Sequence, residues 1–161
     1  EPYRRQRQMC IRDSISPLGF ILGDEGSGAV LGKLLVGDVL KNQLPSTIKE
    51  AFLKQFDLTV PEIIDRVYRQ PFPNRFLASL SPFLAQHLDE PAIRTLVLNS
   101  FIAFLRRNVM QYDYKQYPAH FIGSVAHCYK DILQEAAQQT GIQVGKILQS
   151  PMEGLIQYHQ K

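Results

Sequence analysis

The segment Gly23-Asp24-Glu25-Gly26-Ser27-Gly28 separates a short apolar stretch from the first long helical pattern of the chain. Its glycines allow the backbone to turn tightly and to come close to a ligand. Two interpretations stay open. The segment is a capped helix start, with Asp24 or Ser27 as the cap and Glu25 favourable to the helix dipole, or it is a ligand loop. Its two acids would repel a phosphate but suit a polyhydroxylated ligand, because carboxylates accept hydroxyl hydrogens.

Helical periodicity dominates the sequence downstream of this turn, while residues 15–22 predict a short strand or an extended lead-in. Apolar residues spaced three and four apart predict helices over about residues 28–42 and 47–56. The longest helix is predicted from residue 91 to about 110. Its apolar residues cover more than one stripe, so we expect it to be the central and most buried helix.

Two shorter helices are predicted between these elements. Thr59 and Glu62 form a capping-box pattern, in which each side chain satisfies a group at the helix start. We expect the buried side of that helix to carry Ile63, Ile64, Val67 and Tyr68. The next helix should be kinked or divided by Pro82, because proline lacks the N–H that a helix interior requires.

Residues 118–160 predict a β-α-β-α unit. The first strand ends in the turn Gly123-Ser124, and the helix after it ends at Gly141, which is expected to be a left-handed cap. Gly145 is a point of interruption in the second strand, and Ser150-Pro151-Met152-Glu153 is a capping box for a terminal helix. The Gly123-Ser124 turn is an ordinary strand-to-helix turn or a place where a nucleotide base or ribose lies.

The architecture expected from these patterns is α/β and helix-rich, with a helical cluster over residues 26–112 before the β-α-β-α unit. Only two or three strands are visible, which is fewer than a self-standing sheet usually needs. The sequence therefore predicts that this chain is part of a larger protein. Missing sheet partners would leave an open edge, so dimerisation, as a homodimer, or aggregation is expected.

The net charge of +3 comes largely from residues 1–13. Without the four arginines and two acids of this tract, the totals of 18 basic and 15 acidic residues fall to a net charge of +1. A basic arm could bind nucleic acid, but we favour an incidental tail without a nucleic-acid partner. Residues 4–13 also resemble translated adaptor sequence, so residues 1–13 are expected to be non-native or disordered.

Other common classes of protein find little support in the sequence. No apolar run reaches the roughly 18 to 20 residues that span a bilayer, so we expect a cytoplasmic protein without a membrane partner. The two cysteines and four histidines show no ligand spacing, and no metal site is expected. Neither glycine turn matches the dinucleotide or phosphate-loop fingerprint. No nucleophile constellation is visible, so no catalytic residue is assigned.

Three segments together resemble one family: residues 16–33 around the first glycine turn, residues 121–125 around the second, and residues 150–154. They are similar, in order and spacing, to the C-terminal half of the BadF/BadG/BcrA/BcrD ATPase family, which includes N-acetylglucosamine kinases. The resemblance implies that residues 14–161 form the C-terminal ribonuclease-H-like lobe of an actin-like ATPase or sugar kinase with a small, partial sheet. ATP and an amino sugar would then bind in a cleft against a missing N-terminal lobe.

The resemblance also implies site residues and cofactors. Asp24 would bind sugar hydroxyls, Gly28 would line the sugar pocket, and Gly123 and Ser124 would lie against the adenosine of ATP. The family's phosphate loops and catalytic aspartate, which act with ATP and Mg²⁺, are not found in this sequence, so these residues alone are expected to be inactive. N-acetylglucosamine is the first expectation for the sugar, although Leu18 stands where hexosamine kinases often carry an aromatic residue.

Two other function classes stay open. Some members of the family activate radical dehydratases, so a non-catalytic or partner-activating ATPase on the same fold is the alternative. A helical interaction module that merely shares glycine turns is a third hypothesis.

Overall fold

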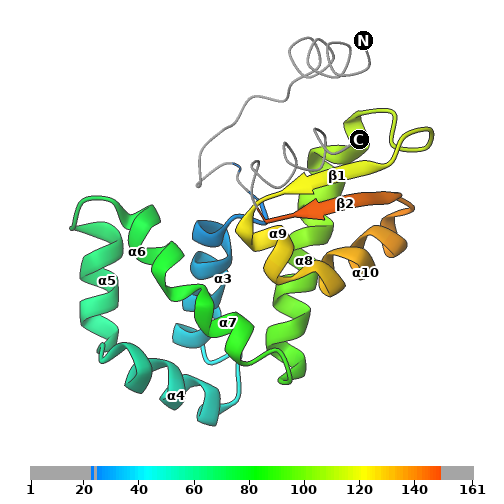
Figure 1. Ribbon diagram of the computed structural model, residues 1–161. Coiled ribbons are helices and arrows are strands. Elements are labelled where there is room, and N and C mark those ends of the chain that lie inside the picture. The colour runs from blue at the N-terminus through cyan, green and yellow to red at the C-terminus, as the bar shows by residue number, and fades with distance from the viewer. Residues whose placement is uncertain (1–22, 24, 150–161) are drawn as a thin grey trace.

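The computed structural model describes residues 23 and 25–149, which form a helical part joined to a smaller α/β part (Figure 1). The predicted strand at 15–22, the tail 1–13 and the terminal capping box and helix lie outside the described residues. The described elements are, in chain order, α3 (Gly28–Leu40), α4 (Ser46–Phe56), α5 (Val60–Tyr68), α6 (Pro73–Leu80), α7 (Pro82–Gln86), α8 (Pro91–Arg107), the 3-10 helix η1 (Val109–Gln111), β1 (Ala119–Ile122), α9 (Ser124–Cys128), α10 (Lys130–Thr140) and β2 (Val144–Leu148).

The helical part is built around the contact between α3 and α6. Gly32 makes this contact close, because a Cβ at this position would lie only 1.9 Å from the backbone carbonyl oxygen of Leu77. The predicted division by Pro82 is confirmed, since α6 ends before it and α7 begins with it. Helix α8 is the longest described helix, as predicted. It packs against α3 of the helical part and against α10 of the α/β part (Figure 1).

Helix α5 confirms its predicted cap but not its predicted buried face. The Thr59 hydroxyl accepts the N–H of Glu62 at 3.4 Å and donates to the Glu62 carboxylate at 2.9 Å. Ile63 is fully buried, whereas Ile64 and Tyr68 are exposed, so their predicted burial is wrong. The physical reason is that α5 packs chiefly on α6 and therefore buries only one narrow side.

The α/β part is a β-α-β unit with two parallel strands. Between the pairs Ala119–Val144 and Phe121–Ile147, the second strand gains one extra residue, which is a bulge at the interruption predicted for Gly145. Gly141 ends α10 with a φ of 78°, which confirms the left-handed cap. The helix predicted between the strands is instead two helices, α9 and α10, which meet at the buried Tyr129.

Candidate functional site

The two glycine turns, about a hundred residues apart in the sequence, line one cavity of about 440 Å³. The first turn enters α3 and the second enters α9, and the two helix starts lie side by side in Figure 1. The lining residues come from the first turn (Glu25, Gly26, Ser27, Gly28), from α8 (Phe101, Phe104), from β1 and the second turn (Phe121, Ile122, Gly123), and from α9 and α10 (Ser124, Val125, Ala126, Leu133). Three of the four predicted site residues, Gly28, Gly123 and Ser124, are therefore brought together.

The first turn is both a helix cap and a wall of this cavity. The Ser27 hydroxyl accepts the N–H of Val30 at 3.2 Å, so Ser27, and not Asp24, caps α3. Asp24 lies outside the described residues. A methyl group on Gly28 would meet the Ser81 hydroxyl only at 3.5 Å, an ordinary contact, so packing alone does not require glycine there. The two interpretations left open by the sequence are thus compatible with each other.

The side chain of Glu25 is held by the end of α8. Its carboxylate accepts hydrogen bonds from Arg107 at 2.9 Å and from Asn108 at 3.4 Å, and only 14% of the side chain is exposed. Burial would raise the pKa of this carboxyl, but the hydrogen bonds from Arg107, from its own backbone and from Asn108, with the charge of Arg107, lower the pKa below its usual value. Glu25 therefore fixes the first turn in place.

Sequence reasoning did not find this contact. Glu25 and Arg107 are 82 residues apart, and nothing local in either segment predicts that they meet. The sequence did place two basic residues, Arg106 and Arg107, at the C-terminal end of α8, where they interact favourably with the helix dipole. These residues were the one indication that a cation near the helix end could hold an acidic partner.

The second turn has a backbone that only glycine adopts readily. Gly123 has φ 145° and ψ 160°, and its missing side chain would point into open space. Its N–H donates to the carbonyl of Leu148 at 2.9 Å, and its carbonyl accepts the N–H of His127 at 3.1 Å, so both backbone groups are used. The turn is therefore fixed in shape, and no atom of the neighbouring described residues lies within 4 Å of the place that a side chain at Gly123 would take.

Aromatic side chains form one wall of the cavity. Phe104 and Phe121 are half-buried and have ring centroids 6.4 Å apart, whereas Phe101, which also lines the cavity, is only 3% exposed. Phe101 and Phe104 were predicted from the sequence only as apolar residues of a buried helix. Flat apolar faces of this kind accept a nucleotide base or the apolar face of a sugar ring.

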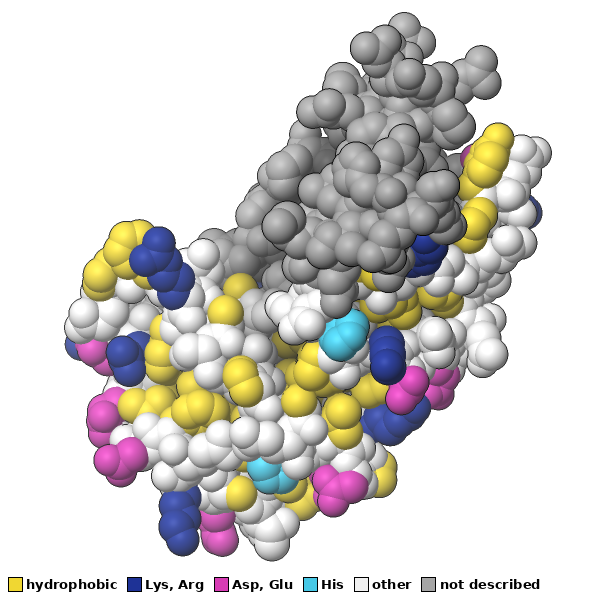
Figure 2. Space-filling view, in the orientation of Figure 1, with side chains coloured by type: hydrophobic (Ala, Val, Ile, Leu, Met, Phe, Trp, Pro, Cys, Tyr) yellow, Lys and Arg dark blue, Asp and Glu magenta, His cyan; other side chains and the backbone are white. Residues whose placement is uncertain are grey.

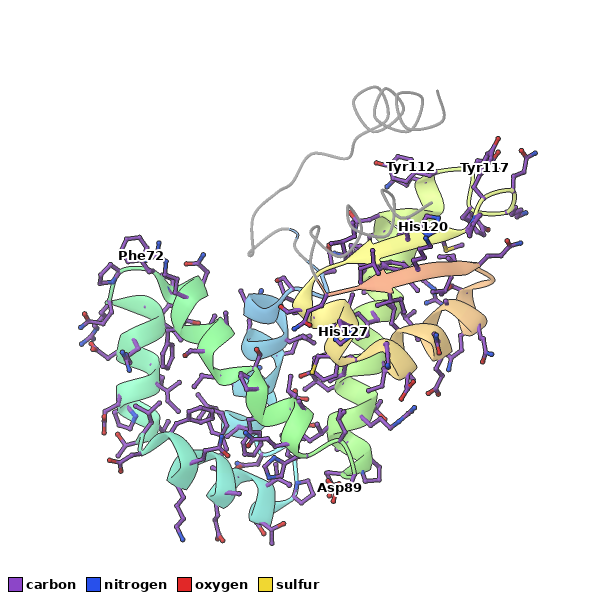
Figure 3. The ribbon with its side chains drawn as sticks, viewed as in Figure 1. Phe72, Asp89, Tyr112, Tyr117, His120 and His127 are labelled. Carbon is purple, nitrogen blue, oxygen red and sulfur yellow. The ribbon has the colours of Figure 1, made fainter. Side chains whose placement is uncertain are left out.

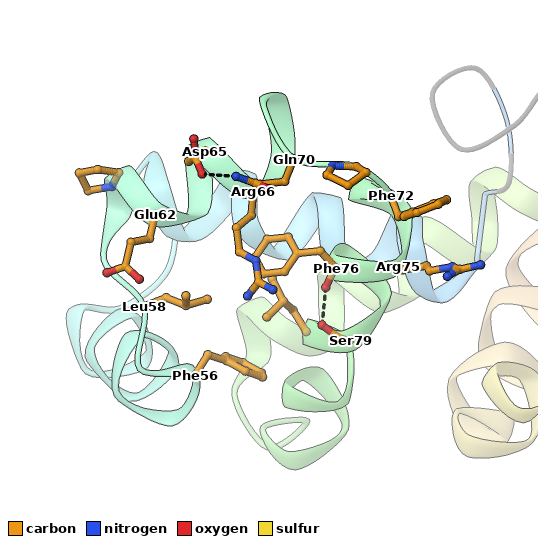
Figure 4. A pocket seen from close by; sticks show the side chains of 13 residues that line it. Phe56, Leu58, Glu62, Asp65, Arg66, Gln70, Phe72, Arg75, Phe76 and Ser79 are labelled. Atoms are coloured by element: carbon orange, nitrogen blue, oxygen red, sulfur yellow. Dashed lines mark hydrogen bonds between the residues drawn. The ribbon is translucent and has the colours of Figure 1, made fainter.

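A larger cavity of about 940 Å³ lies between α5 and α6, away from both glycine turns (Figure 4). The side chains on its rim are engaged with one another: Gln70 donates to Asp65 at 3.0 Å, and the Arg66 guanidinium lies over the Phe76 ring at 4.8 Å. It contains none of the residues that the sequence assigned to a ligand. We therefore take the smaller cavity as the candidate site.

Metal-ligating side chains do not gather in the part of the chain that the structure describes: no group of three His, Cys, Asp or Glu could hold an ion there. His120 and His127, for example, lie on different elements, β1 and α9 (Figure 3). Among residues 23 and 25–149, no helix is long and apolar enough to cross a bilayer.

Comparison with known proteins assigns this fold to a class. No protein-family model and no curated protein matches the chain. The helix-rich architecture with its small two-stranded sheet is that of part of an actin-like sugar kinase. The solved structure that shows this is the "Putative N-acetylglucosamine Kinase" from Porphyromonas gingivalis, which is 59% identical over 90% of this chain with a TM-score of 0.86. The match covers 51% of that structure, so the chain spans about half its length.

Proposed function

We propose that the intact protein is an ATP-dependent kinase that phosphorylates an amino sugar, with N-acetylglucosamine as the first candidate. The observation that carries the proposal is the meeting of the two glycine turns at one cavity. The 59% identity to a chain named as a sugar kinase supports it. Membership of the BadF/BadG/BcrA/BcrD family, with residues 14–161 as its C-terminal lobe in a cytoplasmic enzyme, is part of the same proposal.

Each wall of the cavity receives a role in this proposal. Asp24 binds sugar hydroxyls and Gly28 lines the sugar pocket, while Gly123 and Ser124 lie against the adenosine of ATP. The residues fit such ligands, because the open side of Gly123 and the aromatic wall accept a flat ring. ATP supplies the phosphoryl group and Mg²⁺ stabilises its charge. The catalytic aspartate that removes the hydroxyl proton is assigned to the missing lobe, so these 161 residues alone should show no turnover.

The roles are tested in the intact protein by ADP release at varied sugar and ATP concentrations. Asp24→Ala is expected to raise KM for the sugar at least about 10-fold with little change in KM for ATP, since a lost charge-assisted hydrogen bond costs about 1.5 kcal/mol or more. Glu50→Ala, which removes an exposed carboxylate on α4, is the matched control and should change neither.

A second pair of variants tests the nucleotide wall. Gly123→Ala is expected to raise KM for ATP, because an alanine at φ 145° displaces the turn. Gly37→Ala, in a helical position with no atom within 4 Å of the added methyl group, is its control. Sugar-independent ATP hydrolysis that is stimulated by a partner protein would support the alternative of a partner-activating ATPase. Absence of amino-sugar phosphorylation by the intact protein would overturn the kinase proposal.

A further inference from the structure

The C-terminal end of α8 supports the first glycine turn. A Cβ on Gly26 would lie 3.4 Å from the ring of Phe101 and 3.5 Å from the Cβ of Phe104, so the backbone of the turn packs directly on these two side chains. One helical turn further along α8, Arg107 donates a hydrogen bond to the carboxylate of Glu25. Residues three apart share one side of a helix. This side of α8 therefore contacts two successive residues of the turn.

The position of Glu25 depends on its partners at this helix end. The C-terminal end of a helix carries the negative end of the helix dipole and disfavours a carboxylate. Arg107 at 2.9 Å and Asn108 at 3.4 Å offset this effect, and Arg107 is the stronger donor because its bond is shorter and charged. Only 14% of the Glu25 side chain is exposed. Loss of the arginine would leave a largely buried carboxylate at an unfavourable helix end, so we expect Glu25 to move towards water and to displace the turn.

Arg107 does not itself line the candidate cavity. The lining includes Glu25 and the three residues that follow it, but not Arg107. An effect of Arg107 on a ligand in this cavity would therefore pass through Glu25 or through the overall charge of the surface. On the face shown in Figure 2, the basic and acidic side chains of the described residues are interspersed and form no large patch of one charge. This distribution favours the local route through Glu25.

We propose that Arg107 is a positioning residue for the candidate site: by holding Glu25, it keeps the first turn against α8 in the shape that binds the sugar. The sugar part of this inference rests on the proposed function, because Asp24, to which that function gives the sugar hydroxyls, directly precedes Glu25 in the sequence. The positional part does not rest on it. Apparent affinity falls when only a fraction of the molecules has the binding-competent shape. Loss of the Arg107 bond should lower that fraction.

Steady-state kinetics of the intact protein separate positioning from a general loss of folded protein. Arg107→Ala is expected to raise KM for the amino sugar about 5-fold, the upper range for a partly exposed ion pair. It should leave kcat and KM for ATP unchanged, because saturating sugar selects the competent shape. A loss of folded protein would instead lower the apparent kcat and leave KM for the sugar unchanged. Arg107→Lys keeps the charge and should raise KM for the sugar no more than about 2-fold.

Arg106→Ala is the matched control. Arg106 lies beside Arg107 in the last turn of α8, is exposed, and forms no ion pair within residues 23 and 25–149. Its removal takes away the same charge and the same interaction with the helix dipole. Arg106→Ala should therefore leave KM for the sugar unchanged. An equal rise in KM for Arg106→Ala and Arg107→Ala would be an effect of charge alone and would overturn the proposal.

A double variant tests whether Arg107 acts through Glu25. Glu25→Gln keeps the size of the side chain but removes its charge, so it should itself raise KM for the sugar. Adding Arg107→Ala to Glu25→Gln should then raise KM by less than about 2-fold further, because residues in contact do not contribute independently. Effects of the two changes that multiply in full would mean that Arg107 acts by another route, and the proposal would be wrong.

Hydrogen–deuterium exchange tests the position of the turn without any kinase activity. The N–H of Val30 donates to Ser27 Oγ at 3.2 Å and that of Leu31 donates to the Ser27 carbonyl oxygen at 2.9 Å, so both amides report on the shape of the turn. In the intact protein, Arg107→Ala should speed their exchange about 5-fold relative to Arg106→Ala. Equal exchange in the two variants overturns the positional part. Faster exchange with an unchanged KM for the sugar overturns the sugar part. A protein that phosphorylates no amino sugar overturns the proposed function, and the exchange rates still decide the positional part.

Discussion

Gly32 is the glycine at which one added methyl group should lower the stability of the fold most. It is buried in α3, and an added Cβ would lie 1.9 Å from the carbonyl oxygen and 2.6 Å from the carbonyl carbon of Leu77. Real Cβ atoms essentially never come within 3.0 Å of such atoms, so Gly32→Ala must separate α3 from α6 by about 1 Å. The obstacle is backbone, which cannot rotate away as a side chain would.

The expected change in stability follows from two opposing terms. Overpacking of a tight contact costs about 1–3 kcal/mol, and the rigid backbone neighbour puts Gly32→Ala at the upper end, about 3 kcal/mol. Alanine is favoured over glycine inside a helix by about 1 kcal/mol. The net loss is therefore about 2 kcal/mol. Gly37→Ala in the same helix meets no atom within 4 Å and should stabilise by the helical term alone.

Thermal unfolding followed by circular dichroism measures both variants beside the unchanged chain. At about 2–4 °C per kcal/mol for a chain of this size, Gly32→Ala should lower Tm by about 4–8 °C and Gly37→Ala should raise it by about 2–4 °C. Both variants gain the same helical term, so their difference reports the steric cost alone. A Tm for Gly32→Ala at or above that of the unchanged chain would refute the close α3–α6 contact.

Three further variants test the described contacts. Glu25→Gln should lower stability at neutral pH, and this loss should shrink as the pH falls below 4.5, because the pKa of Glu25 is lowered and its bond with Arg107 is lost as the pH falls through that lowered pKa; melts across pH measure this. Burial, and then the charge of Cys128, raise the pKa of Tyr129 to about 12. The contribution of the neutral Tyr129 to stability should therefore be fully present below pH 10 and be lost as the pH rises towards 12. Thermal melts at alkaline pH should show a smaller loss of stability for Tyr129→Phe than for the unchanged chain. Thr59→Ala should cost about 1 kcal/mol in urea unfolding, the usual value of a helix cap.

Features set by a few neighbouring residues were predictable from the sequence. Thr59 caps α5, Pro82 divides α6 from α7, and Gly141 ends α10, because each depends only on the backbone chemistry of its own segment. The division at Tyr129 was not predictable from periodicity. Apolar residues at three- and four-residue spacing continue across it, and a kink between two helices leaves that spacing unchanged.

Burial on α5 was harder to predict, because periodicity shows which residues share a side but not whether anything packs on that side. Ile64 and Tyr68 fit a helical stripe with Ile63, yet only Ile63 meets α6 and the core. Ile64 and Tyr68 therefore stay exposed, although they continue the apolar stripe of the helix.

The candidate site shows how structure narrows an ambiguous motif. On sequence alone, the first turn was either a helix cap or a ligand loop, and two acids competed for the ligand role. The structure assigns the cap to Ser27 and binds the carboxylate of Glu25 to Arg107 and Asn108. Only 14% of the Glu25 side chain is exposed, so little of its carboxylate is left for a sugar hydroxyl to reach. The sugar-binding role proposed for this turn therefore rests on Asp24, while Glu25 holds the loop that carries it.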